Sequence, residues 1–236
     1  VSKITLLLEF TGELGDVCIR AAADASRPLA DRMRPRNLSE FVGQRQAVGE
    51  GTAIRYAIEN DRMFSMILWG PPGCGKTTLA RIIANETRCH FLHFSAVLSG
   101  VKEIRAVVED AKHQQMFFHK RTILFVDEIH RFNKSQQDAF LHHVESGLIT
   151  LIGATTQNPS FEVIPALMSR CRIITLTSLS DDDIETIIDH ALTNKDRGLG
   201  RETLVVHKDA RAYIIRMADG DGRVALNSVE ITASMV

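Results

Sequence analysis

Residues 66–78 read Met66-Ile67-Leu68-Trp69-Gly70-Pro71-Pro72-Gly73-Cys74-Gly75-Lys76-Thr77-Thr78. A short apolar run leads into a glycine-rich turn that ends in Lys-Thr, and a helical pattern begins immediately afterwards. The stretch fits the phosphate-binding loop pattern G-x-x-x-x-G-K-[ST], which joins a strand to a helix. By ordinary residue frequencies, such a pattern arises by chance in about one chain in a hundred of this length. The working hypothesis is therefore a nucleoside-triphosphatase.

Further along the chain, short apolar runs alternate with helical patterns. The strand candidates are residues 66–69, 91–94, 122–126, 149–153 and 172–176. Helical patterns separate the first four, at residues 77–86, 101–116 and 134–146. Repeated strand–helix–strand units of this length predict right-handed crossovers and a parallel sheet that is covered on both faces. Ligands of such sheets bind beyond the carboxyl ends of the strands, where the glycine-rich loop falls.

The segment before the loop is rich in arginine and holds two prolines. Residues 27–44 predict an extended, irregular connector, and a helical pattern follows from about residue 46 to residue 59. Because this connector precedes the helix that leads into the loop, we expect it to wrap the base of a nucleotide, with Val42 and Gly43 in contact. The alternative is a solvated basic linker. Residues 1–26 are divergent, and we expect a poorly ordered terminus there.

After the fifth strand candidate the pattern becomes all-helical. Ser180-Asp181-Asp182-Asp183 is a helix-capping signal, and two more helical patterns follow at about 207–219 and 224–235. We therefore expect three parts: the terminus at 1–26, a nucleotide-binding domain at 27–178 and an incomplete helical lid at 179–236.

Composition limits the classes of partner and compartment. The 236 residues carry a formal net charge of −1, so nucleic acid would have to bind to a local basic face or an oligomeric ring. The four cysteines share no C-x-x-C spacing, which favours reduced thiols. The apolar runs are shorter than the roughly twenty residues that span a bilayer. We expect a soluble intracellular protein without membrane contact.

The loop residues predict the chemistry of phosphate binding. Glycines let backbone N–H groups curl around phosphate oxygens, and the dipole of the following helix adds to that attraction. Lys76 is expected to reach the β- and γ-phosphates, while the Thr77 hydroxyl ligates Mg²⁺. The alternative is a glycine turn with an incidental lysine. The predicted nucleotide-binding residues of the loop are Gly70, Pro71, Pro72, Gly73, Cys74, Gly75, Lys76, Thr77 and Thr78.

The apolar run at 122–126 leads directly into two carboxylates, Asp127 and Glu128. Acids at the end of a buried strand are costly unless a cation or partner is present. We expect Asp127 in the outer shell of Mg²⁺ and Glu128 as the general base that polarises the attacking water. The alternative is an acid pair that caps a helix. His130 completes a string that mimics a helicase box, but the other helicase signatures are missing, so we assign it no role.

Three more residues are candidates for the site. Asn158, with Thr156 as second choice, follows the fourth strand and is expected to sense the γ-phosphate; a polar turn is the alternative. Arg170 precedes the fifth strand and points away from its own loop, so we expect an arginine finger toward a neighbouring subunit. Arg223 begins the last helical pattern and is expected to reach the nucleotide. For both arginines the alternative is an ordinary surface role.

Several strings resemble a known family. Residues 70–77, the Asp127-Glu128 strand, the Asn158 region, Ser169-Arg170-Cys171 and residues 220–223 look like an AAA+ ATPase of the clamp-loader clade. The longer strings at 130–138 and 153–161 resemble the RarA/MgsA family, the replication-associated recombination proteins related to the Werner-helicase-interacting protein. The resemblance covers about residues 27–234. Lys195-Asp196-Arg197-Gly198 looks more like bacterial members.

The resemblance implies an α/β fold, an AAA+ P-loop NTPase with a five-stranded parallel sheet of order 5-1-4-3-2 and a helical lid. It implies ATP and Mg²⁺, and a DNA-dependent ATPase at stalled or gapped replication forks. Implied partners are gapped or forked DNA, single-stranded-DNA-binding protein and further copies of the chain. The implied location is the bacterial cytoplasm at the nucleoid, or the nucleus in a eukaryote.

Alternative functions are a Holliday-junction-type AAA+ motor, a protein-remodelling ATPase and a scaffold without catalysis. The scaffold is disfavoured because Lys76, Asp127, Glu128 and Arg170 are all present. The chain departs from the family at residues 1–26, at His142 where proline is expected, and at its end inside the lid, before the region that similar proteins use to oligomerise.

Overall fold

A computed structural model describes residues 27–95, 101–202 and 204–235. The expectation for residues 1–26 lies outside the described residues. The described chain divides into two compact units: a sheet unit of Pro35–Ser180 with Asp219–Asp221, and a helical unit whose described residues are 27–34, 181–202, 204–218 and 222–235. Within the described part of the chain, no helix has the combination of length and apolar character that crossing a membrane requires.

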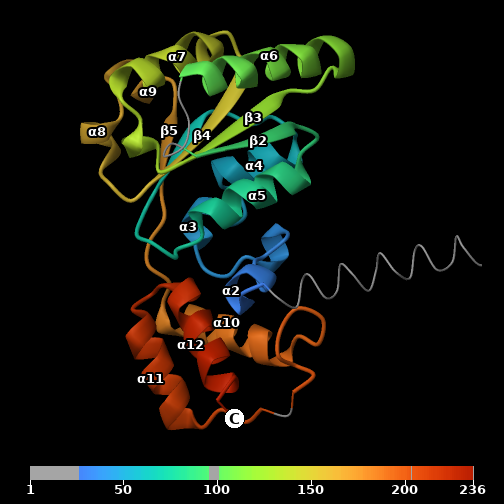
Figure 1. Cartoon of the computed structure of the whole chain (residues 1–236), viewed down its shortest axis with the longest axis vertical. Helices are drawn as coiled ribbons and strands as arrows, with labels where there is room; N and C mark the ends of the chain where they lie inside the picture. The colour runs from blue at the N-terminus through green and yellow to red at the C-terminus, as the bar shows by residue number, and fades with distance from the viewer. Residues whose placement is uncertain (1–26, 96–100, 203, 236) are drawn as a thin grey trace, which may run out of the picture. The chain divides into compact units, whose positions relative to one another are not determined.

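The sheet has five parallel strands in the order β2-β3-β4-β1-β5 (Figure 1). This is the predicted order read from the other edge, so the prediction is confirmed. β1 lies between β4 and β5, with Trp69 opposite Thr155 on one side and Thr175 on the other. The strands are β1 (Met66–Trp69), β2 (His90–Ser95), β3 (Thr122–Asp127), β4 (Ile149–Thr155) and β5 (Arg172–Thr175).

Helices connect the strands and cover the sheet. In Figure 1, α6 and α7 lie over one face and α4 and α5 over the other. The helical elements of the sheet unit are η1 (Leu38–Glu40), α3 (Arg45–Val48), α4 (Ala53–Glu59), α5 (Lys76–Glu86), α6 (Val101–Phe118), η2 (Ile129–Arg131), α7 (Lys134–Glu145), α8 (Pro159–Glu162) and α9 (Pro165–Met168).

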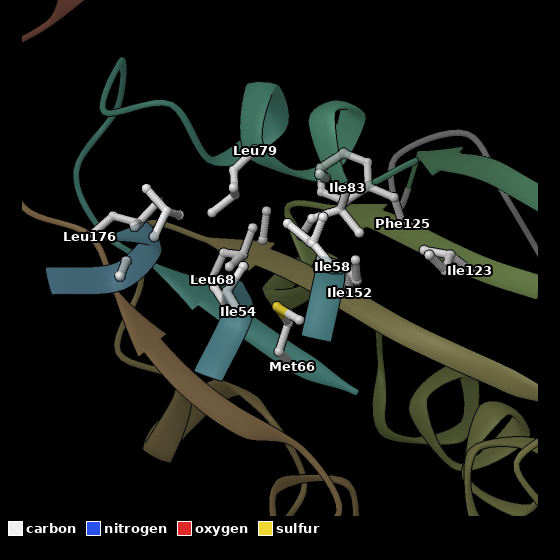
Figure 2. Close-up of a cluster of buried hydrophobic side chains, with 14 of the residues drawn as sticks. Ile54, Ile58, Met66, Leu68, Leu79, Ile83, Ile123, Phe125, Ile152 and Leu176 are labelled. Carbon is white, nitrogen blue, oxygen red and sulfur yellow. The ribbon is translucent and has the colours of Figure 1, made fainter. Parts of the chain in front are cut away.

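Alternate residues of the strands face opposite sides, so each face of the sheet has its own core. Leu68 packs in the cluster drawn in Figure 2, which includes side chains of α4 and α5. Its neighbour Ile67 belongs to the opposite cluster, which α6, α7 and α9 cover. Both side chains are fully buried. This double burial explains why the strands read as continuous apolar runs instead of alternating ones.

The helix predicted from residue 46 to residue 59 is wrong in one respect, because the chain breaks it into α3 and α4. Between them Gly49 has an extended conformation, and Thr52 accepts a hydrogen bond from Arg55 N to cap α4. The irregular connector predicted at 27–44 also holds two short helical turns, α2 (Leu29–Arg32) and η1. A capping hydroxyl competes with continuation of the helix, and a glycine weakens a helix. A prediction based on the spacing of apolar residues takes neither effect into account.

The helical unit consists of α2, α10 (Asp181–Thr193), α11 (Lys208–Ala218) and α12 (Gly222–Ala233). Leu29 N donates to Glu230 Oε1 at 2.8 Å, and Arg32 Nη2 lies 3.5 Å from the same oxygen. These contacts join α2 to α12. Residues 27–34 thus cluster with the helical unit, whereas we expected them in the nucleotide-binding domain, and the turn Asp219–Asp221 clusters with the sheet unit.

Replacing Phe125 by alanine is expected to destabilise the sheet unit. Phe125 is fully buried in β3, and its ring stacks on His93 and Phe91 with centroids 5.3 and 6.3 Å away. Losing that ring is expected to lower the free energy of unfolding by about 3–5 kcal/mol, measured by urea denaturation. The matched control is Phe161→Ala, a side chain that is 84% exposed, with a loss below about 0.5 kcal/mol. Equal losses in the two variants would contradict the assigned core.

Candidate nucleotide-binding site

The glycine-rich loop joins β1 to α5, as predicted. Gly73 and Gly75 have φ angles of 65° and 103°, a region that favours glycine. Space at both positions is also taken: a Cβ on Gly75 would lie 2.8 Å from the Phe41 ring, and one on Gly73 would overlap the Asp221 carboxylate. The Asp221 turn is held on the sheet unit by Leu179 N, which donates to Gly220 O at 3.2 Å. These two glycines are therefore required by conformation and by packing.

Lys76 is the first residue of α5, and its side chain is buried. Its ammonium Nζ donates to Gly70 O at 2.8 Å and to Pro71 O at 2.7 Å, both in its own loop. A buried charge needs such partners, and phosphate oxygens are the stronger acceptors that could replace them. The loop thus holds a cation at its centre, as phosphate binding requires.

Cys74 lies inside the loop and is almost completely buried. Burial raises the pKa of its thiol, and the nearby Lys76 ammonium offsets only part of that rise. The thiol therefore stays protonated at neutral pH and acts as a packing group between the loop and the core.

The side chains of Thr77 and Asp127 come together from α5 and β3. Thr77 Oγ1 lies 3.4 Å from Asp127 Oδ2 and donates a hydrogen bond to it. A hydroxyl and a carboxylate side by side, at the carboxyl ends of parallel strands, are oxygen ligands of the kind that Mg²⁺ takes beside substrate phosphates. These residues fit the magnesium site that the sequence predicted.

Glu128 follows β3 in the left-handed backbone region, with φ of 54° and ψ of 50°. This conformation is uncommon for a residue other than glycine, and it turns the chain sharply into η2. Ile129, the first residue of η2, packs on β4 at Gly153, where a Cβ would lie 2.9 Å from Ile129 Cδ1. The Glu128 side chain stays partly open to solvent. Its placement at the strand end is the one expected of a base that meets water.

His130 was assigned no role from the sequence, and the structure places it in the site. Its Nε2 lies 3.2 Å from Glu128 Oε2, and its Nδ1 lies 3.0 Å from Thr155 Oγ1. Thr155 ends β4 and is fully buried; its carbonyl accepts a hydrogen bond from Gly70 N at 3.2 Å. The signal available in the sequence was the polar Thr155 at the end of an apolar strand, together with the Asp-Glu-Ile-His spacing.

Gln44 is the second residue that the sequence reasoning missed. Its buried carboxamide donates to Cys74 O at 3.3 Å and to Thr177 O at 2.6 Å, and it accepts from Thr177 N at 3.0 Å. Gln44 thus ties the glycine-rich loop to the segment after β5. Val42 and Gly43 directly precede Gln44 in the sequence, and their contact with a nucleotide base stays a prediction.

Asn158 is exposed, and its Oδ1 accepts a hydrogen bond from Ser160 N at 3.0 Å as the cap of α8. Thr156 is half-buried in the same turn. The cap is the alternative that the sequence left open, and the sensor role stays a prediction.

The two candidate arginines lie in different units. Arg170 pairs with Glu145 at 2.5 Å and donates to Ala166 O at 2.7 Å. Arg223 is the second residue of α12 in the helical unit. The roles expected for Arg170 and Arg223 stay predictions.

Comparison with known proteins agrees with the fold. Residues 66–179 match the model of the family "ATPase family associated with various cellular activities (AAA)". A solved structure, the Holliday junction branch migration motor RuvB of Thermotoga maritima, superposes with a TM-score of 0.67 at 29% identity; the match covers 83% of this chain and 63% of that one.

Curated relatives carry names from replication and recombination. The chain is 52% identical over 209 residues to replication-associated recombination protein A of Escherichia coli K12, a match of 89% of this chain and 46% of that protein. It is 44% identical over 204 residues to ATPase WRNIP1 of Dictyostelium discoideum, covering 86% of this chain and 23% of that protein. The chain thus spans about half the length of the bacterial relative. It belongs to the RarA family of AAA ATPases.

Proposed function

We propose that this chain is the ATP-hydrolysing part of a DNA-dependent ATPase that acts at stalled or gapped replication forks. The observation that carries the proposal is the contact between Thr77 Oγ1 and Asp127 Oδ2 at 3.4 Å, with Glu128 next along the chain. This hydrogen bond connects a hydroxyl that follows the phosphate loop to the pair of acids at the end of β3. In P-loop nucleotide hydrolases, a hydroxyl and an acid in these places hold Mg²⁺ beside the substrate phosphates.

The chain's own residues divide the chemistry among them. Backbone N–H groups of the loop and the Lys76 ammonium hold the phosphates. Thr77 and Asp127 would hold Mg²⁺, which neutralises charge on the phosphate oxygens when bound. Glu128 polarises the water that attacks phosphorus, because its carboxylate lies at the strand end and is partly exposed. In this proposal Asn158 senses the γ-phosphate and Arg223 reaches the nucleotide.

The DNA role rests on the relatives, whose names describe replication-associated recombination. Partners in this proposal are DNA with single-stranded gaps or forks, single-stranded-DNA-binding protein and further copies of the chain. The bacterial relatives support a place of action in the bacterial cytoplasm. One observation favours a second candidate function, a Holliday-junction-type motor: the structural similarity to RuvB. The two functions differ in the DNA structure that stimulates hydrolysis.

Replacing Glu128 by glutamine is expected to abolish hydrolysis while nucleotide binding survives. Glutamine keeps the size of the side chain but cannot take a proton, so kcat is expected to fall by at least about 10²-fold. The measurement is phosphate release by the full-length protein in the presence of gapped, forked, four-way-junction or no DNA, with a fluorescent ATP analogue to measure binding.

The DNA panel separates the candidate functions. Gapped and forked DNA are expected to stimulate the wild-type protein most, and an unfolded protein is the control for remodelling activity. A preference for four-way junctions would support the motor instead. Hydrolysis that is equally fast with every DNA and without DNA would contradict the DNA-dependent function but leave the ATPase assignment intact.

Arg170 is expected to act on a neighbouring subunit's nucleotide. An arginine finger contributes about 10³-fold or more in other phosphoryl-transfer enzymes, so Arg170→Ala is expected to lower kcat by roughly that amount. Mixing Arg170→Ala with Glu128→Gln protein is expected to restore activity, because some hybrid sites then combine an intact Glu128 with an intact Arg170.

The control for this experiment is Arg172→Ala. The Arg172 guanidinium lies 4.6 Å from the centre of the Phe64 ring, and we assign it no part in hydrolysis. Its kcat is expected to match that of the wild type. If mixing restores nothing, Arg170 serves its own subunit or has only a structural role.

A further inference from the structure

We propose that His130 positions the Glu128 carboxylate for water activation, with Thr155 as its anchor. The inference rests on the proposed role of Glu128 as general base. It concerns a chain of contacts from the phosphate loop to that base: Gly70 N to Thr155 O at 3.2 Å, Thr155 Oγ1 to His130 Nδ1 at 3.0 Å, and His130 Nε2 to Glu128 Oε2 at 3.2 Å.

Proton counting fixes the direction of the last contact. A general base is a carboxylate, which only accepts hydrogen bonds, so the proton between the two groups must lie on His130 Nε2. One Glu128 oxygen is then occupied by His130, and the other remains to accept a proton from water. A base that is held by a third group in this way is the arrangement that activates water or a nucleophile in many enzymes.

The Thr155 hydroxyl can satisfy His130 in either charge state. The hydroxyl oxygen accepts a hydrogen bond from Gln157 N at 3.0 Å. Its O–H can donate a hydrogen bond either to His130 Nδ1 or to Gln157 O, which lies 3.2 Å away. A neutral imidazole with its proton on Nε2 accepts a hydrogen bond from the hydroxyl at Nδ1, whereas a cationic imidazole donates one from Nδ1 to the hydroxyl oxygen. Either way the ring keeps its orientation, and Nε2 keeps pointing at Glu128.

Burial makes this anchor rigid. Thr155 is fully buried, and the His130 side chain is 15% exposed, against 36% for Glu128. The histidine therefore has little freedom, and the partly exposed carboxylate depends on it for a fixed position. Glu128 itself sits in a left-handed turn, so its backbone gives the side chain no support from a regular helix or strand.

The test compares two amide variants in the full-length protein. His130→Gln places its side-chain nitrogen close to the position of imidazole Nε2, where it can donate to Glu128. His130→Asn places its nitrogen close to Nδ1, where it can contact Thr155 but not the carboxylate. We expect His130→Asn to lower kcat for ATP by roughly 10- to 100-fold, which corresponds to losing one hydrogen bond to a charged group.

The other expected results identify a positioning role. His130→Gln is expected to keep kcat within about threefold of the wild type. The KM for ATP and the Kd of a fluorescent ATP analogue are expected to be unchanged in both variants, because neither touches the phosphate loop. Thr155→Val, which removes the hydroxyl but keeps the carbonyl that accepts from Gly70 N, is expected to lower kcat in the same direction.

His90 supplies a matched control. It also pairs with a carboxylate, through Nε2 and Asp110 Oδ2 at 2.9 Å, but on β2 and α6. His90→Asn is expected to leave kcat unchanged. Equal kcat values for His130→Gln and His130→Asn would overturn the positioning role, as would a rise in KM that accounts for the whole loss.

Glu128→Gln separates this inference from the function on which it rests. If Glu128→Gln hydrolyses ATP like the wild type, the assignment of the base fails and the positioning role fails with it. If Glu128→Gln is inactive while His130→Asn is fully active, only the positioning role fails. In the double variant, His130→Asn is expected to add no further loss to that of Glu128→Gln, since both changes act through one group.

Discussion

The parallel pairing of β1 with β4 is the constraint on which the rest of the site depends. It sets Trp69 opposite Thr155, so the glycine-rich loop begins where β4 ends, and Gly70 N bonds to the Thr155 carbonyl. Because β3 pairs with the other side of β4, its terminal carboxylates emerge at the same edge. Three segments that are distant in the sequence therefore meet there without any side chain having to reach far.

Much of this arrangement could be predicted from the sequence, because its physical signals are local. The loop pattern, the apolar strands and the acids after β3 are each contained within a few residues. The strand-end position of Glu128 and the contact between Thr77 and Asp127 follow from topology once the sheet is parallel. The bounds of α3 and α4 could not be predicted from the sequence. The apolar pattern continues past Thr52, but in the structure Thr52 caps α4 and starts a new helix.

The contacts of Gln44 and His130 could not be predicted, for a different reason. Both depend on which buried carbonyl or hydroxyl lies within about 3 Å of a polar side chain, and that is decided by packing across elements. Gln44 bonds to residues 30 and 133 positions away. No periodicity marks such a residue. Buried polar groups need hydrogen-bond partners, and for Gln44 and His130 these partners are visible only in the folded structure.

The close packing of Ile129 on Gly153 has a consequence for how mutations in this chain would be read. Gly153 lies in β4 opposite Ile67 of β1, and it is not among the residues that we assign to nucleotide binding or hydrolysis. Yet a single added methyl group there meets Ile129, which is bonded directly to Glu128. A side chain at position 153 that alters only the filling of the core would thus press on the residue beside the proposed base, without touching any group that we assign to nucleotide binding.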